Sequence, residues 1–353
     1  MSVGAATTER PTELVGDAAA ARERAIGAFL AGAGWVGAER RWLAGDASMR
    51  RYERLSVAGR TVVLMDAPPP GEDVRPFVHV AQLLRRIGLS APDILAADEE
   101  QGLLLLEDLG DATYTRLLAA GEPEEPLYRL AVDVLIALGQ RVSPADVATL
   151  PRFEDADILL GVERFIDWYW PAATAAPAPA AERERWRDAW QAVLPLRHAL
   201  PEGPALFDYH VDNLLLLPGR SGLAACGLLD FQGAVRAPVG FDLMSLVEDA
   251  RRDVPADLRA ALVERYLAAF PALDREAFDL AWAVMAAQRH ARIIGTFSRL
   301  CVRDGKPHYL EHLPRVWRLL EATLAHPRLE PLRGWFDRAL PPAARGLPAA
   351  LAA

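Results

Sequence analysis

The sequence predicts an α+β fold in two parts, a small antiparallel sheet with one helix inside it, followed by a mainly helical part. Two observations carry this prediction. Before residue 110, short apolar runs rich in strand-forming residues flank turn signals, and after it apolar residues recur at helical spacing. The 353 residues, 52% of them hydrophobic, suffice for one large or two ordinary domains with a sizeable core.

The first part alternates helices with hairpins. A helix is expected over 17–34, where alanine and leucine favour helix and a glycine ends it. Strands over 52–57 and 61–65 flank a short turn, and apolar residues at helical spacing predict a second helix over 75–88. The segment 91–110 then predicts two further strands around a turn.

The second part is helical apart from one strand-like interruption at 205–231. The Pro/Ala-rich stretch from Pro171 to Glu184 is interpreted as a surface loop or a short linker. Six segments carry the helical pattern: 113–121, 125–142, 183–200, 256–270, 276–302 and 312–325.

Composition excludes several classes of protein. Lys plus Arg number 39 and Asp plus Glu 48, so the net charge of −9 disfavours nucleic-acid binding. The two cysteines lack metal-ligand or disulfide spacing. The N-terminus does not resemble a signal peptide, and no window approaches the roughly 18 apolar residues of a membrane helix. We therefore expect a soluble cytoplasmic protein that binds neither nucleic acid nor membrane.

Polar residues crowd the stretch "ALFDYHVDNLLLLPG". Asp208 is followed by Asn213 five residues later, and Asp230 comes after a second apolar run. The intervening segment predicts a hairpin with its turn at 218–222, which brings its two open ends together. We therefore expect these three oxygen-bearing side chains to converge, although such residues also occur in loops that merely cap a buried strand.

The three side chains suit a metal–nucleotide site. Mg²⁺ prefers oxygen ligands and usually takes only one or two carboxylates beside phosphate and water. Asn213 and Asp230 fit as its ligands, and Asp208 is then available to accept a proton from a substrate hydroxyl. This spacing is typical of kinases.

With these residues, the sequence resembles the aminoglycoside phosphotransferase-like kinase family over roughly residues 25–330. The resemblance implies a bilobal protein-kinase-like fold with ATP and Mg²⁺ as cofactors. It implies that the backbone of Glu107, Asp108 and Leu109 meets the adenine, and that Asp242 in "VGFDLMSLVED" braces the catalytic loop. The expected regions are a flexible N-terminus at 1–15, an N-lobe at 16–109, a C-lobe at 110–340 and a tail at 341–353.

Several segments resemble a narrower group, the N-acetylmuramate/N-acetylglucosamine anomeric kinases of bacterial peptidoglycan recycling. The resemblance implies ATP-dependent phosphorylation of the C1 hydroxyl of an amino sugar. It also implies that a sugar-1-phosphate uridylyltransferase consumes the product. The segments are "GDASMRRYERL", "VLMDAPP", "RPFVHVAQLL", "FIDWYWP", "DYHVDNLLLLPG" and "LLDFQGA".

The chain departs from the kinase pattern at two places. Leu206 stands where the motif has histidine, and Met65 stands where kinases keep a phosphate-pairing lysine. No glutamate lies in the helix that follows, so both partners of the usual ion pair are missing there. The candidates to meet the phosphates instead are Ser48, Arg50 and Arg51, with Asp66 ordering that corner.

Substrate contacts have competing interpretations. His210 and Asp212 either order the loop or touch the substrate. Trp168 and Tyr169, with Trp170, either pack in the core or stack on a sugar. Arg251 and Arg252 either balance a helix end or reach the lactyl carboxylate of a muramic acid. Two alternatives for the whole chain remain: a kinase of another small molecule (an aminoglycoside, choline or homoserine), and a nucleotide-binding pseudokinase scaffold.

Overall fold

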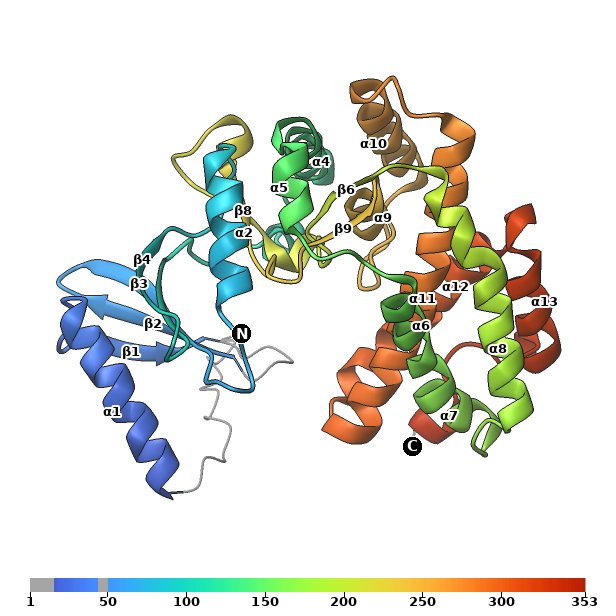
Figure 1. Ribbon diagram of the computed structural model, residues 1–353, viewed down its shortest axis with the longest axis horizontal. Coiled ribbons are helices and arrows are strands. Elements are labelled where there is room, and N and C mark those ends of the chain that lie inside the picture. The colour runs from blue at the N-terminus through green and yellow to red at the C-terminus, as the bar shows by residue number, and fades with distance from the viewer. Residues whose placement is uncertain (1–15, 44–49, 353) are drawn as a thin grey trace. The chain divides into compact units, whose positions relative to one another are not determined.

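The computed structural model describes residues 16–43 and 50–352, with the chain arranged in two compact units (Figure 1). The first unit comprises Met1–Leu117 and Leu214–Gly233, and the second comprises Leu118–Asn213 and Ala234–Ala353. Ser48 and the segment 1–15 lie outside the described residues, and the expectations placed on them stay predictions.

A five-stranded antiparallel sheet in the order β1-β2-β3-β5-β4 forms the body of the first unit. The turn between β2 and β3 has Ala58 at φ 48° and Gly59 at φ 75°, the two positive values of a type I′ hairpin. The four predicted strands are confirmed, and β1 was not predicted. The strands are β1 (Glu39–Trp42), β2 (Arg51–Val57), β3 (Arg60–Asp66), β4 (Ile94–Asp98) and β5 (Leu103–Glu107).

Two helices complete this sheet region, both as predicted. Helix α1 (Gly16–Gly32) places Ile26 and Leu30 in one apolar cluster with alternate residues of β2, β3 and β5. Helix α2 (Arg75–Arg86) begins with a proline in its first turn and buries one apolar face. The apolar strand runs and the helical spacing in the sequence therefore correspond to buried elements.

The hairpin of β7 (Leu214–Leu216) and β8 (Cys226–Leu228) belongs to the first unit. Bridges join it to Ser90 and to Thr113, just before α3 (Tyr114–Ala119). The connection between its strands includes a 3-10 turn at Gly222–Ala225, so it is longer than the predicted turn at 218–222.

The second unit is helical, with one small sheet of β6 (Glu202–Ala205) and β9 (Val235–Pro238). The interpretation of Pro171 to Glu184 as a loop or linker is wrong over most of its length, because Pro171 lies in the first turn of α7 and Pro179 caps α8. The helices are α4 (Glu124–Arg141), α5 (Pro144–Thr149), α6 (Asp155–Arg164), α7 (Trp170–Thr174), α8 (Ala180–Val193), α9 (Phe241–Val247), α10 (Ala256–Ala269), α11 (Arg275–Asp304), α12 (Leu313–Leu324), α13 (Glu330–Ala339) and α14 (Ala349–Ala352).

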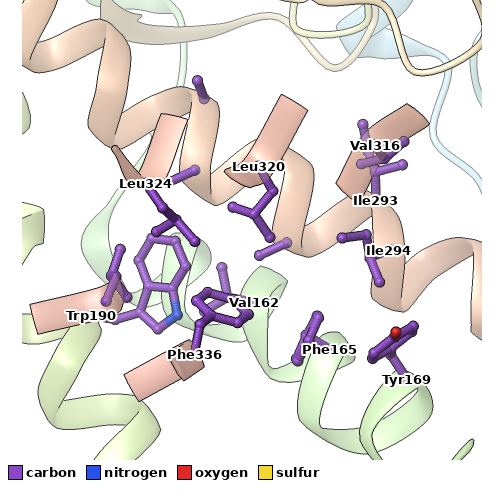
Figure 2. Close-up of a cluster of buried hydrophobic side chains, with 14 of the residues drawn as sticks. Val162, Phe165, Tyr169, Trp190, Ile293, Ile294, Val316, Leu320, Leu324 and Phe336 are labelled. Carbon is purple, nitrogen blue, oxygen red and sulfur yellow. The ribbon is translucent and has the colours of Figure 1, made fainter. Parts of the chain in front are cut away.

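A large apolar core gathers around the long helix α11 (Figure 2). Ile293 and Ile294 of that helix lie in one buried cluster with Phe165, Trp190 and Phe336 from other elements. Aromatic residues bury large areas, so this cluster is a main source of stability for the second unit. Within the described residues, no helix is long and apolar enough to cross a membrane.

Candidate active site

The catalytic loop predicted from the sequence follows β6 and is anchored by a buried carboxylate. Asp242, in the first turn of α9 and only 5% exposed, accepts backbone N–H bonds from Leu206 at 2.6 Å and from Phe207 at 3.0 Å. Burial raises the pKa of Asp242 to about 7, an effect that these two hydrogen bonds oppose. Asp242 thus holds the two residues that immediately precede Asp208.

Phe207 adopts a left-handed backbone conformation, with φ at 78°. This conformation is costly for a residue with a large side chain and persists only where the surroundings enforce it. The ring of Phe207 stacks on Phe241 with centroids 5.5 Å apart. The guanidinium of Arg292, a residue of α11, lies 4.8 Å from the centroid of the Phe207 ring. The strained residue therefore fixes the direction in which the chain enters Asp208.

Two arginines of α11 lie beside the Asp208 carboxylate, and the sequence analysis did not identify them. An Nη1 atom of Arg289 is 4.0 Å and an Nη2 atom of Arg292 is 3.9 Å from Asp208 Oδ1. Asp208 is the accessible member of the group, with 42% of its side chain exposed. Burial lowers the pKa of Arg292 to about 10, and Asp208 opposes that shift.

Asn213 is brought against Asp208 by a single helical turn, Val211–Asn213. Its Nδ2 donates to the carbonyl of Asp208 at 2.8 Å, and its backbone N–H donates to the carbonyl of His210 at 2.9 Å. Because the amide nitrogen is committed to the loop, the amide oxygen is the atom that a cation would bind. Asn213 therefore fits the role of magnesium ligand that the sequence predicts for it.

His210 and Asp212 lie inside the same loop. His210 is buried, with its Nε2 3.4 Å from Asn213 Nδ2. Burial lowers its pKa well below the usual value, and Arg251 and Arg289 add to the shift. Asp212 forms an ion pair with Arg251 at 3.3 Å. These contacts order the loop, and a direct substrate contact by either residue stays a prediction.

Asp230 follows β8 and therefore belongs to the first unit. Its φ of 56° is again left-handed, and Gln232 Nε2 donates to its Oδ1 at 2.5 Å. The next residue, Phe231, stacks on Phe77 of α2 with centroids 4.8 Å apart. Among the residues that the structure describes, no group of three or more His, Cys, Asp or Glu is arranged to hold a metal. A site made by Asn213 and Asp230 together stays a prediction.

The nucleotide-facing candidates of the sheet have partners within it. Met65 is fully buried in β3, between Tyr52 and Leu104 in the strand register. Arg50 Nε forms an ion pair with Glu72 at 2.9 Å, just before α2. This glutamate was not predicted as a partner because it precedes the helix in which kinases carry the glutamate of the ion pair.

The strand positions beside Met65 form a second ordered corner. Arg51 is opposite Asp66 in the register of β2 and β3. Arg22 of α1 donates to Asp66 Oδ1 at 2.8 Å through Nε, and to the carbonyl of Gln101 at 2.6 Å. Asp66 thus ties α1 to β3, and its role in ordering a phosphate-binding corner stays a prediction.

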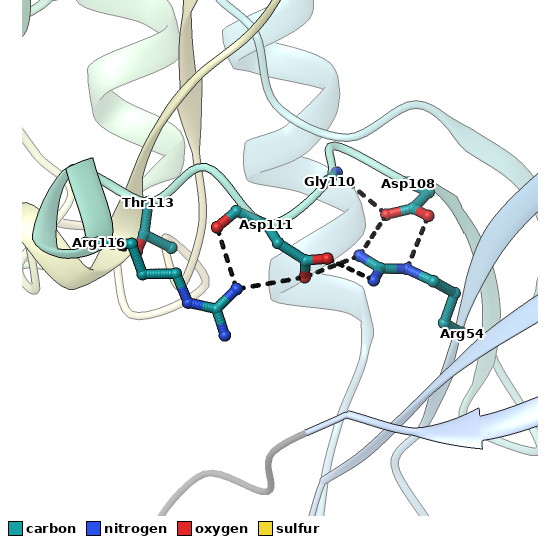
Figure 3. A network of polar contacts seen from close by, with 6 residues as sticks. All are labelled: Arg54, Asp108, Gly110, Asp111, Thr113 and Arg116. Carbon is teal, nitrogen blue, oxygen red and sulfur yellow. Dashed lines mark hydrogen bonds and ion pairs between the residues drawn. The ribbon is translucent and has the colours of Figure 1, made fainter. Parts of the chain in front are cut away.

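The segment Glu107–Leu109, expected to meet adenine, is braced by ionic contacts (Figure 3). Arg54 of β2 contacts Asp108 at 2.7 Å and Asp111 at 2.7 Å, and the N–H of Gly110 donates to Asp108 Oδ1 at 3.0 Å. The paired carboxylates raise the pKa of Arg54, and Arg54 lowers the pKa of Asp111. The contact with adenine itself stays a prediction.

The remaining substrate candidates differ in exposure. Trp168 is half-buried in the π-helical turn Phe165–Tyr169. Tyr169 is fully buried, and its hydroxyl donates to the carbonyl of Gly346 at 3.0 Å, so its ring packs in the core. Arg252 forms an ion pair with Glu124. Arg251, besides its contact with Asp212, lies 5.9 Å from the ring centroid of Phe297.

Curated proteins of known name are similar to this chain over most of its length. An N-acetylmuramate/N-acetylglucosamine kinase of Caulobacter vibrioides is 39% identical, covering 91% of this chain and 97% of its own length. A protein of the same name from Pseudomonas aeruginosa is 40% identical, covering 79% of this chain and 82% of its own length.

Solved structures show the same fold at low identity. A choline kinase LicA from Streptococcus pneumoniae superimposes with a TM-score of 0.58 at 12% identity, over 85% of this chain and 98% of that one. The GDP complex of an aminoglycoside 2'-phosphotransferase-IIIa has a TM-score of 0.58 at 14% identity, over 86% of this chain and 98% of that one. These matches confirm the predicted α+β kinase-like fold.

The sequence profile described as the phosphotransferase enzyme family matches residues 39–278. This span runs from β1, through the hairpin β7–β8, into the start of α11. The profile and the curated relatives agree with the resemblance drawn from the catalytic loop, and the chain belongs to the phosphotransferase enzyme family.

Proposed function

We propose that this protein is an ATP-dependent sugar kinase that phosphorylates the anomeric C1 hydroxyl of N-acetylmuramic acid and N-acetylglucosamine. The observation that carries the choice of substrate is the 39% identity with the Caulobacter vibrioides kinase named for these two sugars, across 97% of that protein. If the two proteins acted on different substrates, the difference would have to come from individual side chains, because their sequences align over almost the whole of the relative.

Asp208 is the proposed catalytic residue. The C1 hydroxyl oxygen attacks the γ-phosphorus of ATP, the new O–P bond forms as the bond to the β-phosphate oxygen breaks, and ADP leaves. The hydroxyl proton passes to the Asp208 carboxylate. The hydrogen bonds from Leu206 and Phe207 to Asp242 support this role, because they fix the backbone that presents Asp208.

Asn213 and Asp230 would hold Mg²⁺, which supplies charge neutralisation on the phosphates when bound. We propose that the backbone of Glu107 to Leu109 meets the adenine and that Arg50, with Arg51, meets the phosphates. The Arg50–Glu72 ion pair would then take over the role of the lysine–glutamate pair of other kinases, whose lysine position holds Met65 in this chain. A guanidinium suits this role because it offers several donors to phosphate oxygens.

The proposed product is a sugar 1-phosphate. A sugar-1-phosphate uridylyltransferase would consume it to make the nucleotide sugar, and the cytoplasm supplies the ATP. Both placements follow from the proposed reaction.

The test is ADP release by the purified protein with ATP and Mg²⁺. The acceptors are N-acetylmuramic acid, N-acetylglucosamine, glucose, kanamycin and none. We expect turnover with the two N-acetylated sugars. Turnover with kanamycin alone would overturn the substrate, and nucleotide binding without turnover on any acceptor would favour a pseudokinase.

A variant tests the role of Asp208. Asp208→Asn should lower kcat by about 10²- to 10⁴-fold, with the Kd for ATP little changed. The matched control is Asp279→Asn on the exposed start of α11, where the lost partner is the surface ion pair with Arg275. Activity within threefold of the wild type in Asp208→Asn would refute the assignment.

A further inference from the structure

One stripe of α11 remains open although the helix is otherwise buried there. Between Ala291 and Leu300, the residues that remain partly exposed are Arg292, Thr296 and Arg299, and the side chain of Arg292 is 18% exposed. They are spaced by four and three residues, so they lie on one face of the helix. At 1.5 Å of rise per residue, Arg299 lies about 10 Å along the axis from Arg292, and Arg292 contacts Asp208.

Arg164, the last residue of α6, joins this stripe. Its Nη1 donates to Thr296 Oγ1 at 3.3 Å. Gly295 of α11 packs against the backbone at that point, since a Cβ atom there would lie 2.3 Å from the carbonyl carbon of Arg164 and 2.4 Å from the nitrogen of Phe165. Arg164 also directly precedes the π-helical turn Phe165–Tyr169, a distortion that is frequent at functional sites. The backbone carrying this guanidinium is therefore held firmly against α11.

Arg292 has Asp208 beside it, whereas Arg164 and Arg299 lack carboxylate partners. Within the described part of the chain, no ion pair involves Arg164 or Arg299, and the buried Nε of Arg299 has no hydrogen-bond acceptor. Burial lowers the pKa of Arg164, and the charges of Arg299 and Arg303 lower it further. A protein with a net charge of −9 has many carboxylates with which to pair such a cluster, yet it leaves this one uncompensated.

We propose that Arg164 and Arg299, together with Thr296, bind the carboxylate of the acceptor and so make this an acceptor site for acidic sugars. This inference rests on the proposed function. Guanidinium groups are suited to carboxylates, which they bind with two parallel hydrogen bonds. The stripe begins at Arg292, which lies beside Asp208. The distance along the helix from Arg292 to Arg299 is about the length of a sugar ring that bears a short acid substituent.

The proposed carboxylate site would distinguish N-acetylmuramic acid from N-acetylglucosamine, and it disfavours an aminoglycoside as the acceptor. N-acetylmuramic acid carries a lactyl carboxylate, whereas N-acetylglucosamine is the same sugar without it. An aminoglycoside is a polycation and would be repelled by the unpaired arginines. Arg251 and Arg252, the candidates from the sequence, already have Asp212 and Glu124 as partners, which makes them the weaker choice for this role.

The experiment compares kcat/KM for the two sugars in Arg164→Gln and Arg299→Gln. Loss of a hydrogen-bonded charge should lower the value for N-acetylmuramic acid about 10- to 100-fold more than that for N-acetylglucosamine, mainly through KM. Arg164→Lys keeps the charge and should recover part of the loss. The control is Arg275→Gln at the start of α11, where the exposed side chain pairs with Asp279 one turn further along.

A second readout does not depend on turnover. The melting temperature of each folded variant is measured with and without N-acetylmuramic acid, and the shift seen with the wild type should be lost in Arg164→Gln. Equal losses for both sugars, or an unchanged preference, would overturn the inference while leaving the kinase assignment standing. A wild-type protein inactive on both sugars would instead overturn the proposed function, and one active only on N-acetylglucosamine would overturn the carboxylate site alone.

Discussion

Replacing Asp242 with asparagine should lower both the stability of the protein and its kcat. The carboxylate accepts one backbone N–H with each oxygen, at 2.6 Å from Leu206 and 3.0 Å from Phe207. Asparagine has the same shape but turns one acceptor into an NH₂ donor, so one of the two buried N–H groups loses its partner. Leaving a buried N–H group without an acceptor costs about 1–3 kcal/mol, and we expect Asp242→Asn to lower the free energy of unfolding by that amount.

The catalytic effect follows from the strain at Phe207. A non-glycine residue at φ 78° stores roughly 1–3 kcal/mol, which the contacts around it must hold. With one restraint gone, Phe207 relaxes and the carboxylate of Asp208 moves. A displacement of about 1 Å at a reacting group typically costs about 10²-fold, so kcat should fall by that factor while KM for ATP changes little.

The assay combines urea unfolding with steady-state kinetics on the proposed sugar acceptors. Asp279→Asn again serves as the control, because its exposed ion pair with Arg275 should contribute under about 1 kcal/mol. An Asp242→Asn protein with kcat within threefold of the wild type would refute the argument that this carboxylate positions Asp208. A large loss of stability with unchanged kcat would refute it equally.

Two further predictions concern α11. Gly295→Ala should lower the melting temperature and should reduce the free energy of unfolding by about 1–3 kcal/mol or more, because the new Cβ would lie 2.3 Å from the backbone of Arg164. The control is Gly27→Ala on α1, which has open space at that position and should be neutral or stabilising. Equal effects of the two substitutions would contradict the reasoning. Burial and the charge of Arg289 lower the pKa of His290 to about 3, so the folded state does not take up the proton that the unfolded state binds below pH 6.5. Stability should therefore fall as the pH drops from 7 to 5, by about 2 kcal/mol from this group, and urea unfolding of His290→Gln should show a shallower dependence; identical pH profiles would count against it.

The regular elements were predictable where burial on one face imposed a period on the sequence. Strand β3 is an apolar run rich in strand-forming residues, which a short turn joins to β2, and α2 repeats its apolar residues every three to four positions. Strand β1 was missed because it is a short strand of charged residues with a single tryptophan, and only its pairing with β2 makes it a strand. The β-propensity of the sequence is a poor guide for an edge strand such as β1.

The catalytic loop was visible because its chemistry is local. Asp208 and Asn213 are five residues apart, and this spacing alone suggested that they share a site. A hydrogen bond from Asn213 to the carbonyl of Asp208 brings the two residues together. Asp242 was found only through the family resemblance. Arg289 and Glu72 act through contacts with residues distant in the sequence or outside the expected element, so no local pattern indicated them.

Helix α11 explains why a fold can be shared while an acceptor site is not. With 3.6 residues per turn, Ile293 and Ile294 face the core while Arg292 and Arg299 face the open stripe, so one helix serves both purposes. Structures at 12–14% identity retain the fold, which requires only apolar residues of suitable size on the buried face. The open face carries no such requirement, and its side chains are free to change with the acceptor. The proposed carboxylate site, made by Arg299 on this face and by Arg164 of α6 beside it, concerns a property that likeness of fold does not show. The comparison of the two sugars, rather than a further comparison of structures, therefore tests the proposal.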